Sequence, residues 1–138
     1  MRQLSNRRQG DLGELSAMEW LGSHGYAIYL PVGHSPDCDL IAERNESLLR
    51  VQVKTTTQYV KRRWAVTICT RGGNQSWNGT VKRFSAKRCE RLFVLAADGR
   101  RWFIPSVSVG GGSAVLLGGP KYAQFEVEAG RPLPSQQS

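Results

Sequence analysis

Acidic residues are nearly absent from the middle of this 138-residue sequence. Between Arg50 and Arg91 the chain carries eleven Lys and Arg residues against one acid, Glu90, whereas the rest of the chain has eight bases and ten acids. The excess behind the net charge of +8 therefore comes from one contiguous segment. Such clustering favours a polyanionic partner such as nucleic acid. A soluble surface with a general basic bias is the alternative.

Long apolar runs and paired cysteines are also lacking. No stretch approaches the roughly 20 apolar residues of a membrane span. The first fifteen residues, MRQLSNRRQGDLGEL, are charged and have no apolar core behind them, which excludes a signal peptide. Three cysteines at 38, 69 and 89 have no metal-like spacing. We interpret them as reduced thiols of a cytoplasmic protein.

The length fits one domain, which we place at residues 1–130 and follow with a disordered tail at 131–138. Apolar spacing and a closing glycine predict a helix over 10–25. Strands are predicted, in order, at 27–32, 38–43, 48–55, 64–70, 92–96, 101–104 and 125–127. A helix followed by a mostly antiparallel sheet predicts a mixed α/β or α+β domain.

The second and third predicted strands are separated by the short polar loop 44–47, which predicts a hairpin. With that loop, Asp39 lies opposite Gln52 and Asp37 lies opposite Lys54. Directly opposed residues of antiparallel strands have Cβ atoms about 5 Å apart. A slip of one residue would break this arrangement.

The third strand has two different faces, because successive side chains alternate. One face carries Leu49, Val51 and Val53, and the other carries Arg50, Gln52 and Lys54. Either the polar face meets water or it holds a ligand. A carboxylate and an amide oxygen at hairpin separation can share one hard cation, with an ammonium one step along the strand.

The order of these residues resembles the PD-(D/E)xK nuclease superfamily. Asp39 is followed after twelve residues by Gln52-x-Lys54, and Glu14 stands on the preceding helix. The segments DLIA, LLRVQVKT and CERLFVLAADGRRWFIPS are closest to the group I intron-associated homing endonucleases and are also similar to archaeal Holliday-junction resolvases. The homing branch is favoured because its members also have Gln in place of an acid. The resemblance covers about residues 7 to 108.

This resemblance implies a restriction-endonuclease-like core, with a mixed, mostly antiparallel sheet flanked by helices. It implies a catalytic centre made of Glu14, Asp39, Gln52 and Lys54, in which the first three bind Mg²⁺ and Mn²⁺ can substitute. It also implies a prokaryotic or phage protein acting on double-stranded DNA. Because cleavage of both strands needs two centres and this chain has one, we expect a homodimer or homotetramer.

Each candidate also has a plainer interpretation. Glu14 can be a solvated helix acid, and Glu19 competes for its role. Asp39 can cap a turn, and Asp37 belongs to the literal Pro-Asp pair. His34 is expected to be a phosphate contact or an ordinary loop residue.

The basic segment is expected to bind the DNA. Phosphate contacts are predicted at Lys61, Arg62, Arg63, Lys82, Arg83, Lys87 and Arg88. Contacts to bases are predicted at Asn74, Gln75 and Asn78, although a polar surface loop is an equal alternative. Trp102 and Phe103 are expected in the core or an interface.

The sequence therefore predicts a Mg²⁺-dependent DNA endonuclease of the sequence-specific, homing type. Two alternatives stay open. One is a structure-specific resolvase or repair nuclease with the same centre. The other is a nucleic-acid-binding domain that has lost activity, with Gln52 as the sign of that loss.

Overall fold

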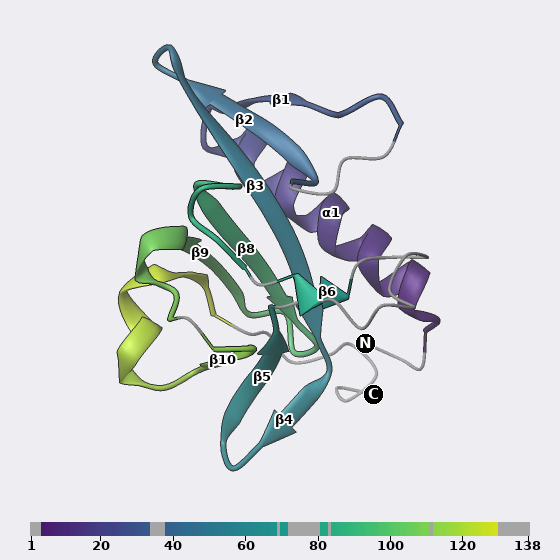
Figure 1. The fold of residues 1–138 in the computed structure, drawn as a ribbon, viewed down its shortest axis with the longest axis vertical. Helices are drawn as coiled ribbons and strands as arrows, with labels where there is room; N and C mark the ends of the chain where they lie inside the picture. Colours follow the sequence, from purple (N-terminus) through teal and green to yellow (C-terminus); the bar gives the residue numbers. More distant parts are fainter. Residues whose placement is uncertain are drawn as a thin grey trace, which may run out of the picture.

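The computed structural model describes residues 4–33, 38–68, 70–71, 81–82, 84–110 and 112–129, with only the backbone at 70–71 and 81–82. Helix α1 (Asn6–Ser23) opens the fold (Figure 1). The strands are β1 (Ala27–Tyr29), β2 (Leu40–Arg44), β3 (Ser47–Thr56), β4 (Gln58–Val60), β5 (Arg63–Thr67), β6 (Thr70–Arg71), β7 (Val81–Lys82), β8 (Arg91–Ala96), β9 (Arg101–Pro105), β10 (Ala114–Leu117) and β11 (Glu126–Glu128). Short 3₁₀ helices lie at Ser106–Ser108 and Pro120–Phe125.

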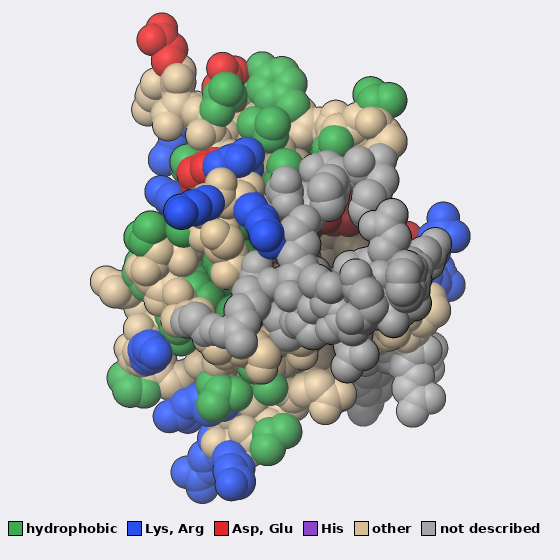
Figure 2. Space-filling view, in the orientation of Figure 1, with side chains coloured by type: hydrophobic (Ala, Val, Ile, Leu, Met, Phe, Trp, Pro, Cys, Tyr) green, Lys and Arg blue, Asp and Glu red, His purple; other side chains and the backbone are tan. Residues whose placement is uncertain are grey.

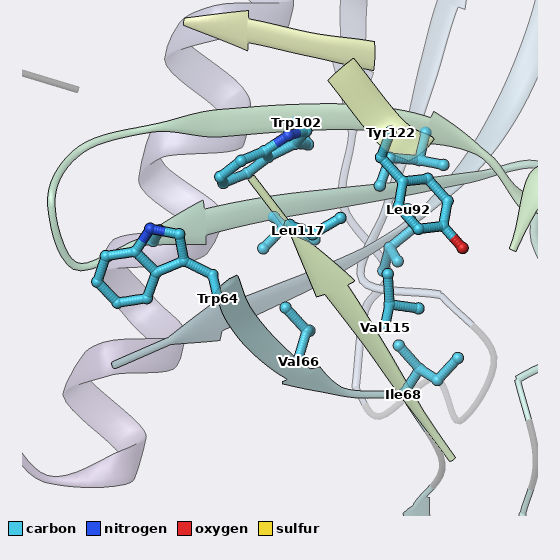
Figure 3. Packing of buried hydrophobic residues seen from close by; sticks show 11 residues of the cluster. Trp64, Val66, Ile68, Leu92, Trp102, Val115, Leu117 and Tyr122 are labelled. Atoms are coloured by element: carbon cyan, nitrogen blue, oxygen red, sulfur yellow. The ribbon is translucent and has the colours of Figure 1, made fainter. Parts of the chain in front are cut away.

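The central sheet has the strand order β1-β2-β3-β8-β9-β11, and its pairs are antiparallel except for the parallel pair β3–β8. Helix α1 covers one face, where Trp20 and Leu21 pack with Val51 and Phe93. A second sheet, β10-β5-β4, covers the other face. Trp64 and Val66 of β5 pack there in the same apolar cluster as residues of β8 and β9 (Figure 3).

Strand β8 shows how the sequence encodes these two layers. Phe93 packs toward α1, whereas Leu92 and Val94 belong to the cluster under the second sheet. A strand buried on both faces needs a continuous apolar run, and the segment LFVLA provides one. Trp102 is fully buried in the same cluster, so its prediction as a core residue is confirmed.

The predicted fold class is confirmed, and the differences are local. The helix begins at Asn6 rather than at residue 10, because Ser5 caps it by accepting a hydrogen bond from the Arg8 N–H at 3.2 Å. The glycine-rich connection near residue 114 contains β10, whose four residues alternate between exposed and buried. In the described residues α1 is the one α-helix on the central sheet, and a second sheet takes the place of helices on the opposite face.

Two hairpin turns have a costly backbone geometry. The β2–β3 turn has Asn45 and Glu46 at φ 54° and 65°, and the β4–β5 turn has Lys61 and Arg62 at φ 51° and 66°. Positive φ at both central residues is typical of a type I′ turn, which favours Asn-Gly. For a residue with a Cβ this left-handed geometry costs about 1–2 kcal/mol. The two turns lie at opposite ends of the molecule (Figure 1).

No helix within the described ranges has the length and apolar character needed to cross a membrane. The predicted tail at 131–138 lies outside the described residues.

Candidate active site

The β2–β3 register is the predicted one. Five pairs run from Arg44 opposite Ser47 to Leu40 opposite Val51. The ladder of paired residues ends there, one residue short of Asp39, whose backbone N–H donates to the Val51 carbonyl at 2.9 Å. Among the described residues, no strand pairs with the β2 side of β3 beyond Val51.

The Asp39 carboxylate sits on this open edge of β3. Its Oδ2 accepts a hydrogen bond from the Val53 N–H at 2.7 Å, so the side chain continues the ladder where the strand stops. One carboxylate oxygen is thereby fixed. Within the described part of the chain, Oδ1 has no hydrogen-bond or ion-pair partner and remains able to accept a ligand.

Gln52 and Lys54 lie on the face of β3 opposite to α1. Val51, which packs on the α1 side of the strand, is fully buried, while the side chains of Gln52 and Lys54 are half-buried. Their register partners on β8, Leu92 and Val94, are fully buried. The two polar groups thus stand at the margin of an apolar layer. Among the described residues neither has a side-chain hydrogen bond or ion pair, so both polar groups are available to a ligand.

Glu14 reaches the same edge from the helix side. Burial raises the pKa of its half-buried carboxyl, and the negative charges of Asp39 and then Asp11 raise this pKa further. This charge coupling indicates that Glu14 and Asp39, two of the predicted metal ligands, are near enough to influence each other. Glu14 lies on the α1 side of the sheet and Gln52 on the opposite side, so an ion that both residues bind would have to lie at this edge of β3.

The donor set is one of oxygens alone. Among the described residues, no three His, Cys, Asp or Glu side chains lie close enough together to hold a metal ion by themselves. Two carboxylates and one amide oxygen are nevertheless suitable ligands for a hard cation such as Mg²⁺ or Mn²⁺. The mutual repulsion of Glu14 and Asp39 also favours a divalent cation between them. The residues present therefore fit such an ion. His34 and Asp37 lie outside the described residues.

Glu19, the competitor of Glu14, has a structural partner. The side chain of Arg101, 9% exposed, donates to Glu19 at 2.7 Å and pairs with Glu128. The same guanidinium donates to the Ser16 carbonyl at 3.2 Å. This buried arginine ties α1 to β9 and β11, which assigns Glu19 to the fold.

The residues predicted to contact DNA differ in their solvent exposure. Lys61 and Arg62 are exposed at the β4–β5 tip, and Lys87 is exposed in the turn before β8. Arg88 is half-buried. Arg63 is also half-buried and lies against Gly119, where a Cβ would come within 2.4 Å of its Nε, so much of its side chain serves packing. Outside the described side chains lie Asn74, Gln75, Asn78, Lys82 and Arg83.

Sequence reasoning gave no role to Glu90, the one acid of the basic segment. Its carboxylate pairs with the Arg50 guanidinium at 2.5 Å and accepts the Arg50 N–H at 2.7 Å. The Arg50 side chain also donates to the Lys87 carbonyl at 3.1 Å. These contacts fasten the basic turn to β3, two residues before Gln52. A partner forty positions away leaves no local signal in a sequence.

Glu90→Gln is expected to destabilise the protein at neutral pH. The hydrogen bond to Arg50 lowers the pKa of Glu90 in the folded state. The resulting stability is present above the unfolded pKa, about 4.3, and is lost as pH falls through the lower folded value. Thermal denaturation should therefore show a lower Tm for the variant at pH 7. The gap should shrink toward about pH 3, and an equal gap at both pH values would contradict this account. Glu46→Gln, at an exposed acid, is the matched control.

Gly13→Ala is expected to lower both Tm and cleavage. A Cβ at Gly13 would lie 2.5 Å from Thr55 Cγ2 and 3.2 Å from Val53 Cγ1, so α1 would have to move off β3 and take Glu14 with it. Overpacking of this kind costs about 1–3 kcal/mol, against a gain of about 1 kcal/mol in helix propensity. Gly10→Ala, in the same helix with nothing within 4 Å, should gain stability. Equal Tm changes for the two variants would refute the close approach.

Comparisons with known proteins identify the family and the fold. A sequence model of the PD-(D/E)XK endonuclease family matches residues 4–88, which include Glu14, Asp39, Gln52 and Lys54. A bacterial homing endonuclease, I-Ssp6803I, has a similar structure with a TM-score of 0.67 and 18% sequence identity over 88% of this chain and 87% of its own. At that identity the likeness concerns the fold. No curated protein sequence matches the chain.

Proposed function

Because this chain belongs to the PD-(D/E)XK endonuclease family, we propose that it is a metal-dependent enzyme that hydrolyses phosphodiester bonds in duplex DNA at the open edge of β3. The observation that carries the proposal is the position of Asp39. Its carboxylate is fixed by the Val53 N–H at the point where β2 ends, beside Gln52 and Lys54, whose side chains have no partner among the described residues. One oxygen of this acid serves the fold, and the remaining carboxylate oxygen, the amide and the ammonium are the groups that a metal and a phosphate would use.

In this proposal Glu14, Asp39 and Gln52 hold Mg²⁺ or Mn²⁺ through their oxygens. A bound divalent cation neutralises charge on the phosphate oxygens and lowers the pKa of a coordinated water. Lys54 then orients the attacking water or stabilises the anionic transition state. Gln52 supplies an oxygen without a full negative charge. We therefore expect weaker Mg²⁺ binding than with Glu at this position.

The basic residues support a path for DNA along β3. Lys87 and Arg88 lie in the turn that Arg50 fastens to one end of the strand. Lys61 and Arg62 lie at the tip of β4–β5, beyond the other end. Figure 2 shows Lys and Arg side chains on the left and right flanks of this face and at its lower end, where Figure 1 places the β4–β5 hairpin. Phosphate contacts at both ends would hold a duplex over Lys54.

The finer assignments belong to the same proposal. Asn74, Gln75 and Asn78 would contact base edges and make cleavage sequence-specific, as expected of a homing-type enzyme. One centre per chain implies a homodimer or homotetramer for cleavage of both strands.

A cleavage panel tests the proposal. Purified protein is incubated with Mg²⁺, Mn²⁺ or EDTA on supercoiled plasmid, on a pool of random duplexes and on a four-way junction. Nicking or cutting of plasmid or duplexes that EDTA abolishes is the expected result. Selective cutting of the junction would favour the resolvase alternative. Binding without cleavage across all substrates and metals would overturn the enzymatic proposal in favour of an inactive binding domain.

A further inference from the structure

The tip of the β4–β5 hairpin carries two cations in an unfavourable backbone geometry. Lys61 and Arg62 both have positive φ, 51° and 66°, and both are exposed. Asn-Gly is the sequence that most easily forms a type I′ turn, so neither Lys61 nor Arg62 favours this turn. Backbone strain of this kind persists where the surrounding structure enforces it and often serves function.

The base of this hairpin is firmly held. Trp64, 8% exposed, belongs to the buried cluster, and the Tyr59 ring packs against it with centroids 4.8 Å apart. The hydroxyl of Thr56 donates to the Ala65 carbonyl at 2.5 Å and accepts the Gln58 N–H at 3.1 Å. The hairpin therefore projects from the core as a stiff arm, with the two cations at its end.

The arm is a direct continuation of the strand that carries Lys54. Strand β3 ends at Thr56, and β4 begins at Gln58. Lys61 follows Lys54 by seven positions, which at about 3.3 Å per residue places their backbones at most about 23 Å apart. At about 3.4 Å per base pair, this backbone distance corresponds to about seven base pairs of duplex.

We propose that the β4–β5 tip is a phosphate clamp that holds duplex DNA on one side of the cleavage site, within about seven base pairs, at a cost in stability of the free protein. Lys61 and Arg62 contact the sugar-phosphate backbone and fix the position of the duplex without reading its sequence. The inference rests on the proposed function for its substrate, and it adds where and how that substrate is held.

The double substitution Lys61→Asn with Arg62→Gly separates the two roles of the tip. It installs the preferred turn sequence, so Tm is expected to rise by about 3–6 °C. At the same time, duplex affinity near 0.15 M salt is expected to fall at least about tenfold, and the slope of log K against log salt to shrink by about two. The loss should be equal for duplexes of different sequence. Footprinting should show lost protection on one side only, within about seven base pairs of the cut.

Two control variants separate the effect of the tip from the effects of turn strain and of charge removal in general. Glu46→Gly relieves the matching turn at the opposite end of the molecule and should raise Tm without weakening DNA binding. Arg7→Gln with Arg8→Gln removes the same two charges from the exposed start of α1 and should leave the footprint edge in place. An unchanged footprint for the tip variant, or an equal loss of affinity in the α1 variant, would overturn the clamp.

This outcome is independent of catalysis. If the wild-type protein binds DNA but cleaves none, the proposed enzymatic function is wrong. The footprint and the salt dependence of binding still test the phosphate clamp in that case.

Discussion

Asp39→Ala is expected to reduce DNA cleavage by about 10³-fold or more while leaving DNA affinity within a few fold. The substitution removes the carboxylate that β2 places on the open edge of β3. The cationic residues that bind the duplex lie elsewhere, so binding should persist. Single-turnover cleavage in Mg²⁺ and a fluorescence binding titration measure the two effects.

Asp39→Asn separates the chemical role of this residue from its structural one. In wild type, Asp39 Oδ2 satisfies the Val53 N–H at 2.7 Å, and alanine would leave that donor without its partner. The amide oxygen of asparagine can still accept the bond but brings no charge. We therefore expect a Tm near wild type and cleavage as poor as that of the alanine variant. Wild-type cleavage by the asparagine variant would show that the charge at this edge is dispensable.

Lys54→Met is the second substitution with a large expected effect. The side chain is half-buried beside the fully buried Val94, and within the described region it has no ion pair. Methionine keeps most of the length of this side chain and removes its charge. Tm is expected to stay equal or rise. Cleavage is expected to fall by about 10²–10³-fold, with metal binding retained, because the ammonium acts on the reacting phosphate or water.

The control for this substitution is Lys121→Met, which removes the same charge from an exposed site. It should leave cleavage at the wild-type rate. A Lys54→Met variant that cleaves normally would assign the lysine to the solvated face of an amphipathic strand. A large drop in its Tm would assign it to the fold.

The sequence predicted the parts of this site that depend on local rules. A short polar loop fixed the β2–β3 register, and the alternation of side chains then placed Gln52 and Lys54 on one face of β3. The pairing of Asp39 was predicted less well. Asp39 was expected to pair through its backbone, but its carboxylate accepts the Val53 N–H instead. That ending depends on where β2 stops, which strand propensity defines only to within a few residues.

Contacts distant in sequence could not be predicted. Arg101 holds Glu19 across 82 positions, and Arg50 holds Glu90 across 40. The second sheet was missed in part, because β10 is four residues between glycine-rich segments and becomes a strand only by pairing with β5. These contacts decide which acids are structural. They remove Glu19 from the candidate ligands and leave Glu14, placed against β3 by the close approach at Gly13.

The central claim is that Asp39 and Gln52, with Glu14, hold one divalent cation at the edge of β3. Anomalous diffraction from crystals grown with Mn²⁺ tests it most directly. The account predicts a peak about 2.0–2.3 Å from an Asp39 carboxylate oxygen and the Gln52 amide oxygen, with the Lys54 ammonium nearby. A well-occupied peak elsewhere, or density showing Gln52 and Lys54 turned away from Asp39, would contradict it.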